Sequence, residues 1–229
     1  MMKLSRRMQV GMSAAGIAGA ALIFLGSLIA AIGFSGRYGQ SYSFLNHFVS
    51  ELGEIGISKF AWAFNGGLIA GGLLLTFFVL NFVFLMEGWV RFIFLGAALS
   101  TGLSGTLVGI LPMNNIGPHI VAAMTFFYSG MFSTFSFSLY VLFQKRSIYP
   151  KWLSFPGILS ALAFFALIFL TKPISSEESQ LEVPSPFSQN RPSFWATPFI
   201  EWIAVLSILL WVILVAGYYL TRLKPKVMP

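Results

Sequence analysis

Six apolar runs, each about 20 residues long, constrain this chain more than any other feature of its sequence. A helix of about 20 residues crosses the roughly 30 Å of hydrocarbon in a bilayer and satisfies its own backbone hydrogen bonds there. The mean hydropathy is +0.82, with 57% hydrophobic and 9% charged residues, which leaves too little polar surface for a water-soluble domain. We therefore predict an all-α polytopic membrane protein, a single domain with six transmembrane helices in one bundle.

The predicted spans follow the apolar runs, and polar turns separate them. They cover residues 14–34, 60–85, 90–111, 119–143, 152–171 and 198–220. The first run is too long for the core of a cleaved signal peptide, so we expect it to be retained. Glycines spaced by four residues, at Gly67 and Gly71 and again at Gly105 and Gly109, favour close contact between helix backbones.

The distribution of Lys and Arg predicts the orientation. If both termini lie on one side, that side holds ten of the fourteen cations. The ten are Lys3, Arg6, Arg7, Arg91, Lys145, Arg146, Lys151, Arg222, Lys224 and Lys226. The other side holds Arg37, Lys59, Lys172 and Arg191. Because Lys and Arg are enriched in cytoplasmic loops, we predict a multi-pass protein of the cell membrane with both termini in the cytoplasm.

Composition also limits the partners. The net charge of +7 comes without a basic and aromatic patch, so we expect membrane lipids and no nucleic acid as partners. The chain has no cysteine, which removes disulfides, thiolate metal sites and thiol nucleophiles. We expect no cofactor, and the oligomeric state is left open.

A polar motif, residues 46–54 with the sequence NHFVSELGE, precedes the second run. Its polar and apolar residues alternate at helical spacing, so a short helix would put His47, Ser50 and Glu51 on one face. Gly53 is expected to end this helix in the left-handed conformation. Polar groups are expensive at a membrane, so the motif predicts a polar pocket at the outer mouth of the bundle.

Further polar residues fall on the same predicted side. Asn65 lies in the start of the second span, where a buried amide needs partners. Turn residues Asn114 and Asn115 precede the fourth span, and His119 and Glu201 lie near the starts of the fourth and sixth. The predicted binding residues are His47, Glu51, Asn65, Asn114 and Asn115.

The favoured function is binding of a lipid or another amphiphile, because this needs only a polar cluster above an apolar groove. A membrane-embedded hydrolase is an alternative, with Ser50 as nucleophile, His119 as base and Glu201 as the orienting carboxylate. His47 could act as the base in place of His119, and Glu51 could act as the orienting carboxylate in place of Glu201. Transport of a small molecule is a second alternative.

Two further interpretations stay open. Four side chains could together bind a metal ion: His47, Glu51, His119 and Glu201. No strong metal-ligand spacing supports this, so no metal site is predicted. The polar residues could also be structural, since a carboxylate near a helix N-terminus is favoured by the helix dipole and Asn is an ordinary turn residue. The long loop at 172–197, rich in Ser, Glu and Pro, is predicted to be irregular and to cover the pocket.

Three segments carry a resemblance to a known family: the motif at residues 46–54, the Phe64-Asn-Gly-Gly67 segment, and the Gly105-to-Pro112 segment with His119 soon after. The chain resembles the bacterial and archaeal membrane family catalogued as domain of unknown function 998. More distantly it is similar to eukaryotic autophagy-modulator and GPI-anchor lipid-remodelling membrane proteins. The resemblance implies six helices and leaves the activity unassigned. Asn114 and Asn115 stand where relatives are expected to carry an acidic residue.

Overall fold

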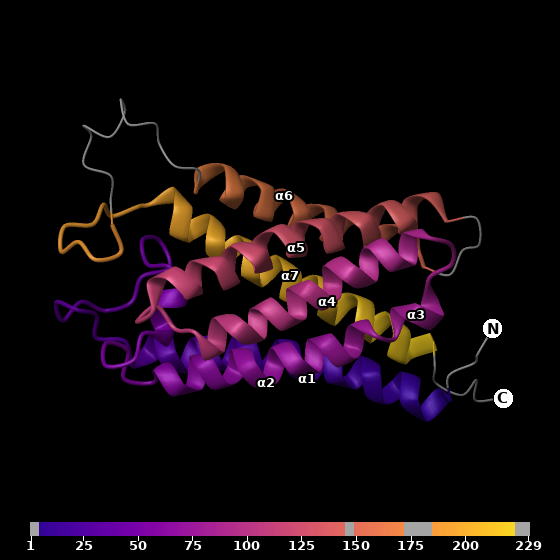
Figure 1. Cartoon of the computed structure of the whole chain (residues 1–229), viewed down its shortest axis with the longest axis horizontal. Helices are drawn as coiled ribbons and strands as arrows, with labels where there is room; N and C mark the ends of the chain where they lie inside the picture. Colours follow the sequence, from indigo (N-terminus) through magenta and orange to yellow (C-terminus); the bar gives the residue numbers. More distant parts are fainter. Residues whose placement is uncertain (1–4, 145–148, 172–184, 223–229) are drawn as a thin grey trace.

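The computed structural model describes residues 5–144, 149–171 and 185–222, and it is helical apart from turns and loops. Six long helices run along its longest dimension (Figure 1). They are α1 (Arg6–Ile32), α2 (Ala61–Val79), α4 (Val90–Ile110), α5 (Ile116–Phe143), α6 (Ser154–Leu170) and α7 (Ala196–Arg222). The short helix α3 (Phe82–Leu85) extends α2, and the 3₁₀ helix η2 (Lys151–Leu153) leads into α6. Within these described ranges, six helical segments are long and apolar enough to cross a membrane, which confirms the predicted fold class.

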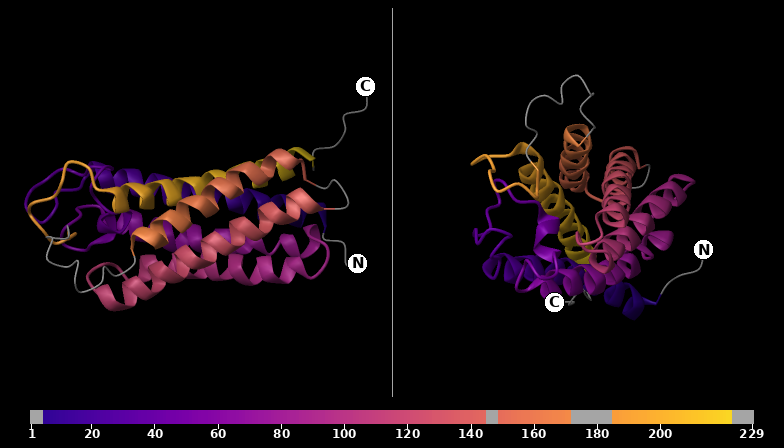
Figure 2. Two further views of the ribbon diagram at one scale, coloured as in Figure 1. Left: turned by 90° about the horizontal axis from the view of Figure 1, so that it is seen from above. Right: turned by 60° about the vertical axis from the view of Figure 1, so that its left-hand side comes forward.

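The long helices form a ring in the order of the sequence. Each packs against the next, and α7 closes the ring against α1. Figure 2 shows this arrangement from above and obliquely from one end. A ring of six helices encloses an interior that is reached by side chains from several helices at once.

Glycines bring the backbones of α1 and α2 together, as predicted. A Cβ added at Gly67 would lie 2.8 Å from the carbonyl oxygen of Leu22, and one at Gly71 would lie 2.7 Å from that of Gly19. The two glycines of the second predicted pair, Gly105 and Gly109, have different surroundings. A Cβ at Gly109 would come 2.6 Å from the carbonyl oxygen of Asn65, whereas Gly105 has only the ring of Phe126 nearby, at 3.6 Å.

The polar motif forms a 3₁₀ helix, η1 (Val49–Gly53), and the predicted longer helix is wrong. Phe48 is extended, with φ −64° and ψ 148°, so His47 lies outside the helix and does not share a helical face with Ser50 and Glu51. Gly53 is not left-handed either. Its role is close approach, because a Cβ there would come within 2.3 Å of Asn65 Oδ1.

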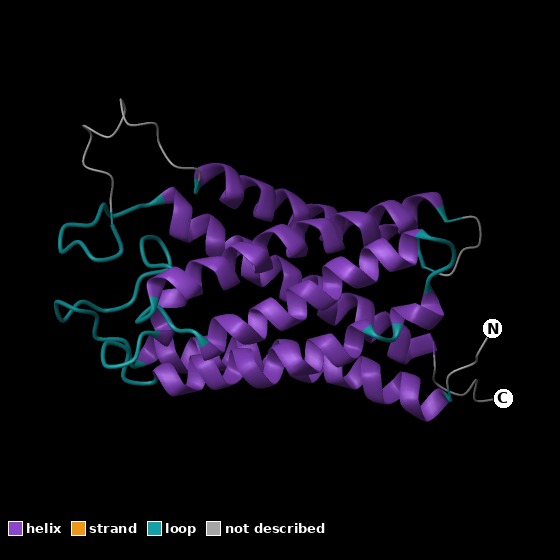
Figure 3. Cartoon of the chain, viewed as in Figure 1, coloured by secondary structure: helices purple, strands orange, loops and turns teal. Residues whose placement is uncertain are grey.

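The two ends of the bundle differ. Helix α1 begins and α7 ends at one end, which we call the terminal end, and the loops around η1 lie at the other, which we call the motif end (Figure 3). The loop at 185–195 also lies at the motif end (Figure 1), and its role as a cover over the pocket stays a prediction. Residues 172–184 of that predicted loop lie outside the described residues.

Candidate functional site

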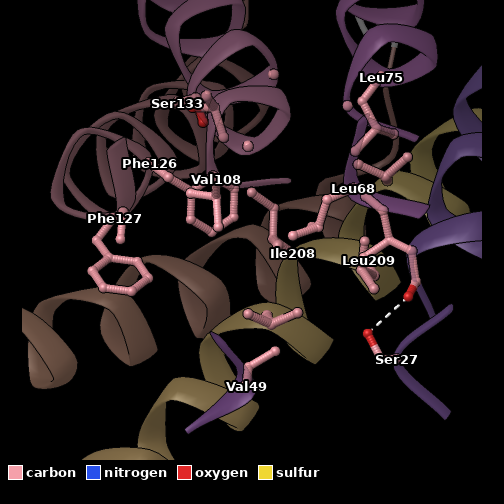
Figure 4. A pocket seen from close by; sticks show the side chains of 18 of the residues that line it. Ser27, Val49, Leu68, Leu75, Val108, Phe126, Phe127, Ser133, Ile208 and Leu209 are labelled. Carbon is pink, nitrogen blue, oxygen red and sulfur yellow. Dashed lines mark hydrogen bonds between the residues drawn. The ribbon is translucent and has the colours of Figure 1, made fainter. Parts of the chain in front are cut away.

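A cavity lies inside the ring of helices. Side chains from α1, α2, α4, α5 and α7 and from η1 line it, including Val49, Leu68, Val108, Phe126 and Ile208. Figure 4 shows these side chains converging on one space. The centre of a water molecule can occupy about 90 Å³ of it. Because a single water needs roughly 10–15 Å³ by this measure, the space is larger than a packing defect.

The middle of the cavity is apolar although hydroxyl side chains line it. Three of these hydroxyls bond to a carbonyl of their own helix: Ser27 to Ile23 at 2.8 Å (Figure 4), Thr101 to Ala97 at 2.8 Å and Ser133 to Gly130 at 3.0 Å. Their hydrogen-bonding capacity is therefore largely used within the helices. The described lining includes no Lys or Arg.

The three predicted catalytic residues, Ser50, His119 and Glu201, all line this cavity. Each of the three side chains makes a hydrogen bond with a different partner. The Ser50 hydroxyl donates to Met113 Sδ at 3.3 Å, His119 Nδ1 lies 2.7 Å from the Leu111 carbonyl oxygen, and Glu201 Oε2 accepts from Val49 N–H at 2.8 Å. No hydrogen bond joins one of the three to another within the described ranges. Their catalytic role stays a prediction.

Glu201 and Asn65 hold η1 in place from two helices. Glu201 of α7 accepts from the Val49 N–H at the start of η1, and Asn65 Nδ2 of α2 donates to the Gly53 carbonyl at its end, at 2.9 Å. These bonds satisfy backbone groups that a short helix leaves unpaired. Asn65 thus has the partner that the sequence required, and it fixes the end of η1.

Glu51 is the centre of a buried clasp between two loops. Its carboxylate binds Arg191 through two parallel bonds of 2.8 Å and also accepts from Phe48 N–H at 2.8 Å. Only 7% of the Arg191 side chain and 4% of the Glu51 side chain are exposed. Burial raises the pKa of Glu51 above its ordinary value, and Arg191 and the Phe48 N–H oppose this rise. Asn46 adds a bond from Nδ2 to the Pro192 carbonyl at 2.8 Å.

His47 is buried beside this clasp. Asn46 Nδ2 donates to Pro192, and Asn46 Oδ1 lies 2.8 Å from His47 Nδ1, which the Ser43 N–H also contacts at 3.3 Å. Nε2 is buried with no hydrogen-bond partner in the described part of the chain. The ring packs edge-on against Phe34 at 5.4 Å between centroids. His47 is therefore held as a neutral ring within the loop.

Tyr42 and Trp202 join the loop to α7, a contact that the sequence reasoning missed. Trp202 Nε1 donates to Tyr42 Oη at 2.8 Å, and the Tyr42 hydroxyl donates to the Phe48 carbonyl at 2.9 Å. Burial, and next the carboxylate of Glu201, raise the pKa of Tyr42 well above its ordinary value. The phenol therefore stays protonated and can keep donating.

Asn114 and Asn115 lie outside the cavity. Asn114 binds both the N–H and the carbonyl of Ile55, at 2.8 and 2.9 Å, and so ties the turn before α5 to the loop after η1. Asn115 precedes α5, and its carbonyl accepts from His119 N–H at 3.1 Å. A neighbouring ion pair joins Arg37 to Glu54. These contacts fix loops, and a ligand role for the two asparagines stays a prediction.

The metal interpretation gains no support from the geometry. Among the described residues, no three His, Asp or Glu side chains gather closely enough to hold a metal ion. His47 and Glu51, which the sequence placed on one helical face, are separated because η1 begins at Val49.

Together, the fold and the cavity define a class: multi-pass membrane proteins of six helices with an apolar interior space that has polar groups at one end. A family model described as "Protein of unknown function (DUF998)" matches residues 17–218. Because this match covers most of the chain, the chain belongs to that family. Searches of curated proteins and of solved structures find no match.

Proposed function

We propose that the protein binds an amphiphile inside the helical ring. The alkyl part lies in the apolar cavity, and the polar part lies beside Ser50, His119 and Glu201 at the motif end. The observation that carries the proposal is the position of these three polar side chains on the wall of a cavity that is otherwise apolar. A pocket with a mostly apolar lining and a few convergent polar groups is the usual form of a small-molecule site.

The depth of the cavity fits one leaflet of a bilayer. Glu201 and Val212 of α7 both line it, and eleven residues of helix span about 16 Å at 1.5 Å per residue. This is about half of the roughly 30 Å hydrocarbon thickness. An acyl chain of a membrane lipid therefore has the length that the cavity offers.

We also propose that the motif end faces the outside of the cell membrane and that both termini are cytoplasmic. The excess of Lys and Arg on the terminal side supports this orientation. The site would then accept an amphiphile from the outer leaflet or from outside the cell.

Photo-crosslinking tests the binding proposal. The full chain in nanodiscs is incubated with a hexadecyl amphiphile that carries a diazirine in its chain, irradiated and digested, and the labelled residues are identified by mass spectrometry. We expect labels on cavity residues such as Val108 and Ile208. Labels confined to residues on the lipid-facing surface would overturn the proposal.

A cavity-filling variant provides the matched comparison. Gly105 lines the cavity, and a Cβ there meets only ordinary contact with Phe126 at 3.6 Å, so Gly105→Leu extends into the free space. Gly96 lies on the same helix, is exposed and has nothing within 4 Å of an added Cβ. Gly105→Leu should abolish most of the cavity labelling, and Gly96→Leu should leave it unchanged.

A further inference from the structure

The polar groups at the motif end of the cavity include two hydrogen-bond acceptors. A carbonyl oxygen can only accept, so the 2.7 Å contact with Leu111 puts the proton of a neutral His119 ring on Nδ1. Nε2 then carries a lone pair. Glu201 uses Oε2 for the Val49 N–H, and no hydrogen bond of Oε1 is found among the described residues. The wall therefore offers an imidazole nitrogen and a carboxyl oxygen to a ligand.

Ser50 adds a third acceptor. Its hydroxyl hydrogen is directed to Met113 Sδ at 3.3 Å, which leaves the oxygen lone pairs available. With a neutral His119 ring, none of the three side chains, Ser50, His119 and Glu201, carries a positive charge.

Positive charge is absent from the described lining of the cavity. Two cations of the neighbouring loops are bound to other partners: Arg191 holds Glu51 through two bonds, and Arg37 pairs with Glu54. Phosphate and carboxylate groups are recognised in proteins by Arg, Lys or several N–H donors. An anionic head group in this cavity would be buried without a Lys or Arg to pair with among the described residues of the lining, which is unfavourable in a medium of low dielectric constant.

The shape of the cavity limits the apolar part. The cavity offers about 90 Å³ of space for a water centre, and its lining on α7 extends from Glu201 to Val212, over about 16 Å. This small volume favours one unbranched chain over two parallel chains.

We propose that the ligand is a single-chain amphiphile whose small head group donates a hydrogen bond and carries no negative charge, as a primary amine or a primary alcohol does. This inference rests on the proposed function. Glu201 Oε1 and His119 Nε2 accept from the head group, and the alkyl chain extends toward Val212.

A ligand series of constant chain length tests the head group on the wild-type protein. Hexadecylamine, hexadecan-1-ol, hexadecanoic acid and hexadecyl phosphate compete separately with the photoreactive hexadecyl probe for the full chain in nanodiscs. We expect the amine or the alcohol to compete at least about ten times better than the acid and the phosphate, a factor that corresponds to about 1.4 kcal/mol.

The outcomes separate the inference from the proposed function. Equal competition by all four compounds, or better competition by the acid or the phosphate, would overturn the head-group inference and leave amphiphile binding intact. Failure of every compound to displace the probe from cavity residues would overturn both. Better competition by the amine than by the alcohol would support an ionised Glu201 as the acceptor.

Glu201→Gln provides a second, independent test. The amide oxygen can still accept from Val49 N–H, while the carboxyl group that the head group would contact is removed. We expect the preference for amine over acid to fall at least about tenfold, whereas Glu87→Gln, at an exposed position of the terminal end, should leave it unchanged. An unchanged preference in a folded Glu201→Gln protein would contradict the proposal. If that variant does not fold, the wild-type ligand series still decides.

Discussion

His47 should make the stability of the motif end depend on pH. The residue is 3% exposed, and Nε2 has no hydrogen-bond partner in the described ranges. Burial, and next the positive charge of Arg191, lower the pKa of His47 from 6.5 to about 4. Protonation of the folded chain would place an unpaired charged donor in a buried site beside another cation, which is costly.

The magnitude follows from the difference in proton binding between the two states. Below about pH 6.5 the unfolded chain protonates His47, whereas the folded chain does so only near pH 4. The stability that comes from the neutral ring is complete above pH 6.5 and is lost as the pH falls through this window. At about 1.4 kcal/mol per pH unit, the free energy of unfolding drops by about 2 kcal/mol between pH 7 and pH 5. For a chain of this size, this corresponds to about 4–8 °C in Tm.

Thermal unfolding of the full chain in detergent at the two pH values measures this effect, with His47→Gln as the comparison. Burial raises the pKa values of Glu51 and Glu54, whose titration acts in the opposite direction, but both proteins share that contribution. Between pH 7 and pH 5 the Tm of the wild type should therefore fall about 4–8 °C more than that of the variant. If the Tm of the wild type and the Tm of His47→Gln fall by the same amount to within about 1 °C, the reasoning is refuted.

Three further predictions concern the loops and the orientation. Arg191→Gln should lower the Tm by about 10 °C at neutral pH, since it leaves Glu51 buried without its partner, and acidification should recover part of the loss; a loss independent of pH would contradict this. Gly53→Ala should cost about 1–3 kcal/mol, because the new Cβ would meet Asn65 Oδ1 at 2.3 Å, and a Tm equal to that of the wild type would exclude this close approach. A cysteine at Ser41 should react with an impermeant thiol reagent added to intact cells and one at Glu87 should not; the reverse labelling would invert the proposed orientation.

The spans could be predicted from the sequence to within a few residues at most ends. Apolar runs and the turns between them determine where a helix can cross a membrane. The largest difference is at α1, which begins at Arg6 and not near residue 14. Ser5 caps this helix by accepting from Met8 N–H at 3.4 Å, so the helix extends beyond the apolar run into a polar segment. Hydropathy marks the part of a helix within hydrocarbon and does not locate its cap.

The extent and the apolar lining of the cavity could not be predicted, because the residues that line it are of the same types as those that fill a packed interior. Gly105 shows the difficulty: its spacing with Gly109 indicates helix contact, and only the tertiary structure shows that it faces open space. The ion pairs of the motif, including the Glu51–Arg191 clasp, could have been predicted from the charges in the sequence. The predicted outer side carries few cations, and two of them, Arg37 and Arg191, pair with the two carboxylates of the motif.

Glu201 contacts both η1 and the cavity in which the head group is proposed to bind. One of its oxygens holds the first N–H of η1, and the proposed head group would bind the other. Because η1 is fixed at its end by Asn65 and is adjacent to the Glu51–Arg191 clasp, any shift of the Glu201 carboxylate toward a ligand also loosens the start of η1. A ligand that donates to Oε1 while Oε2 keeps its bond stabilises both the site and the loops above it. The polar motif therefore need not contact the ligand to affect its binding.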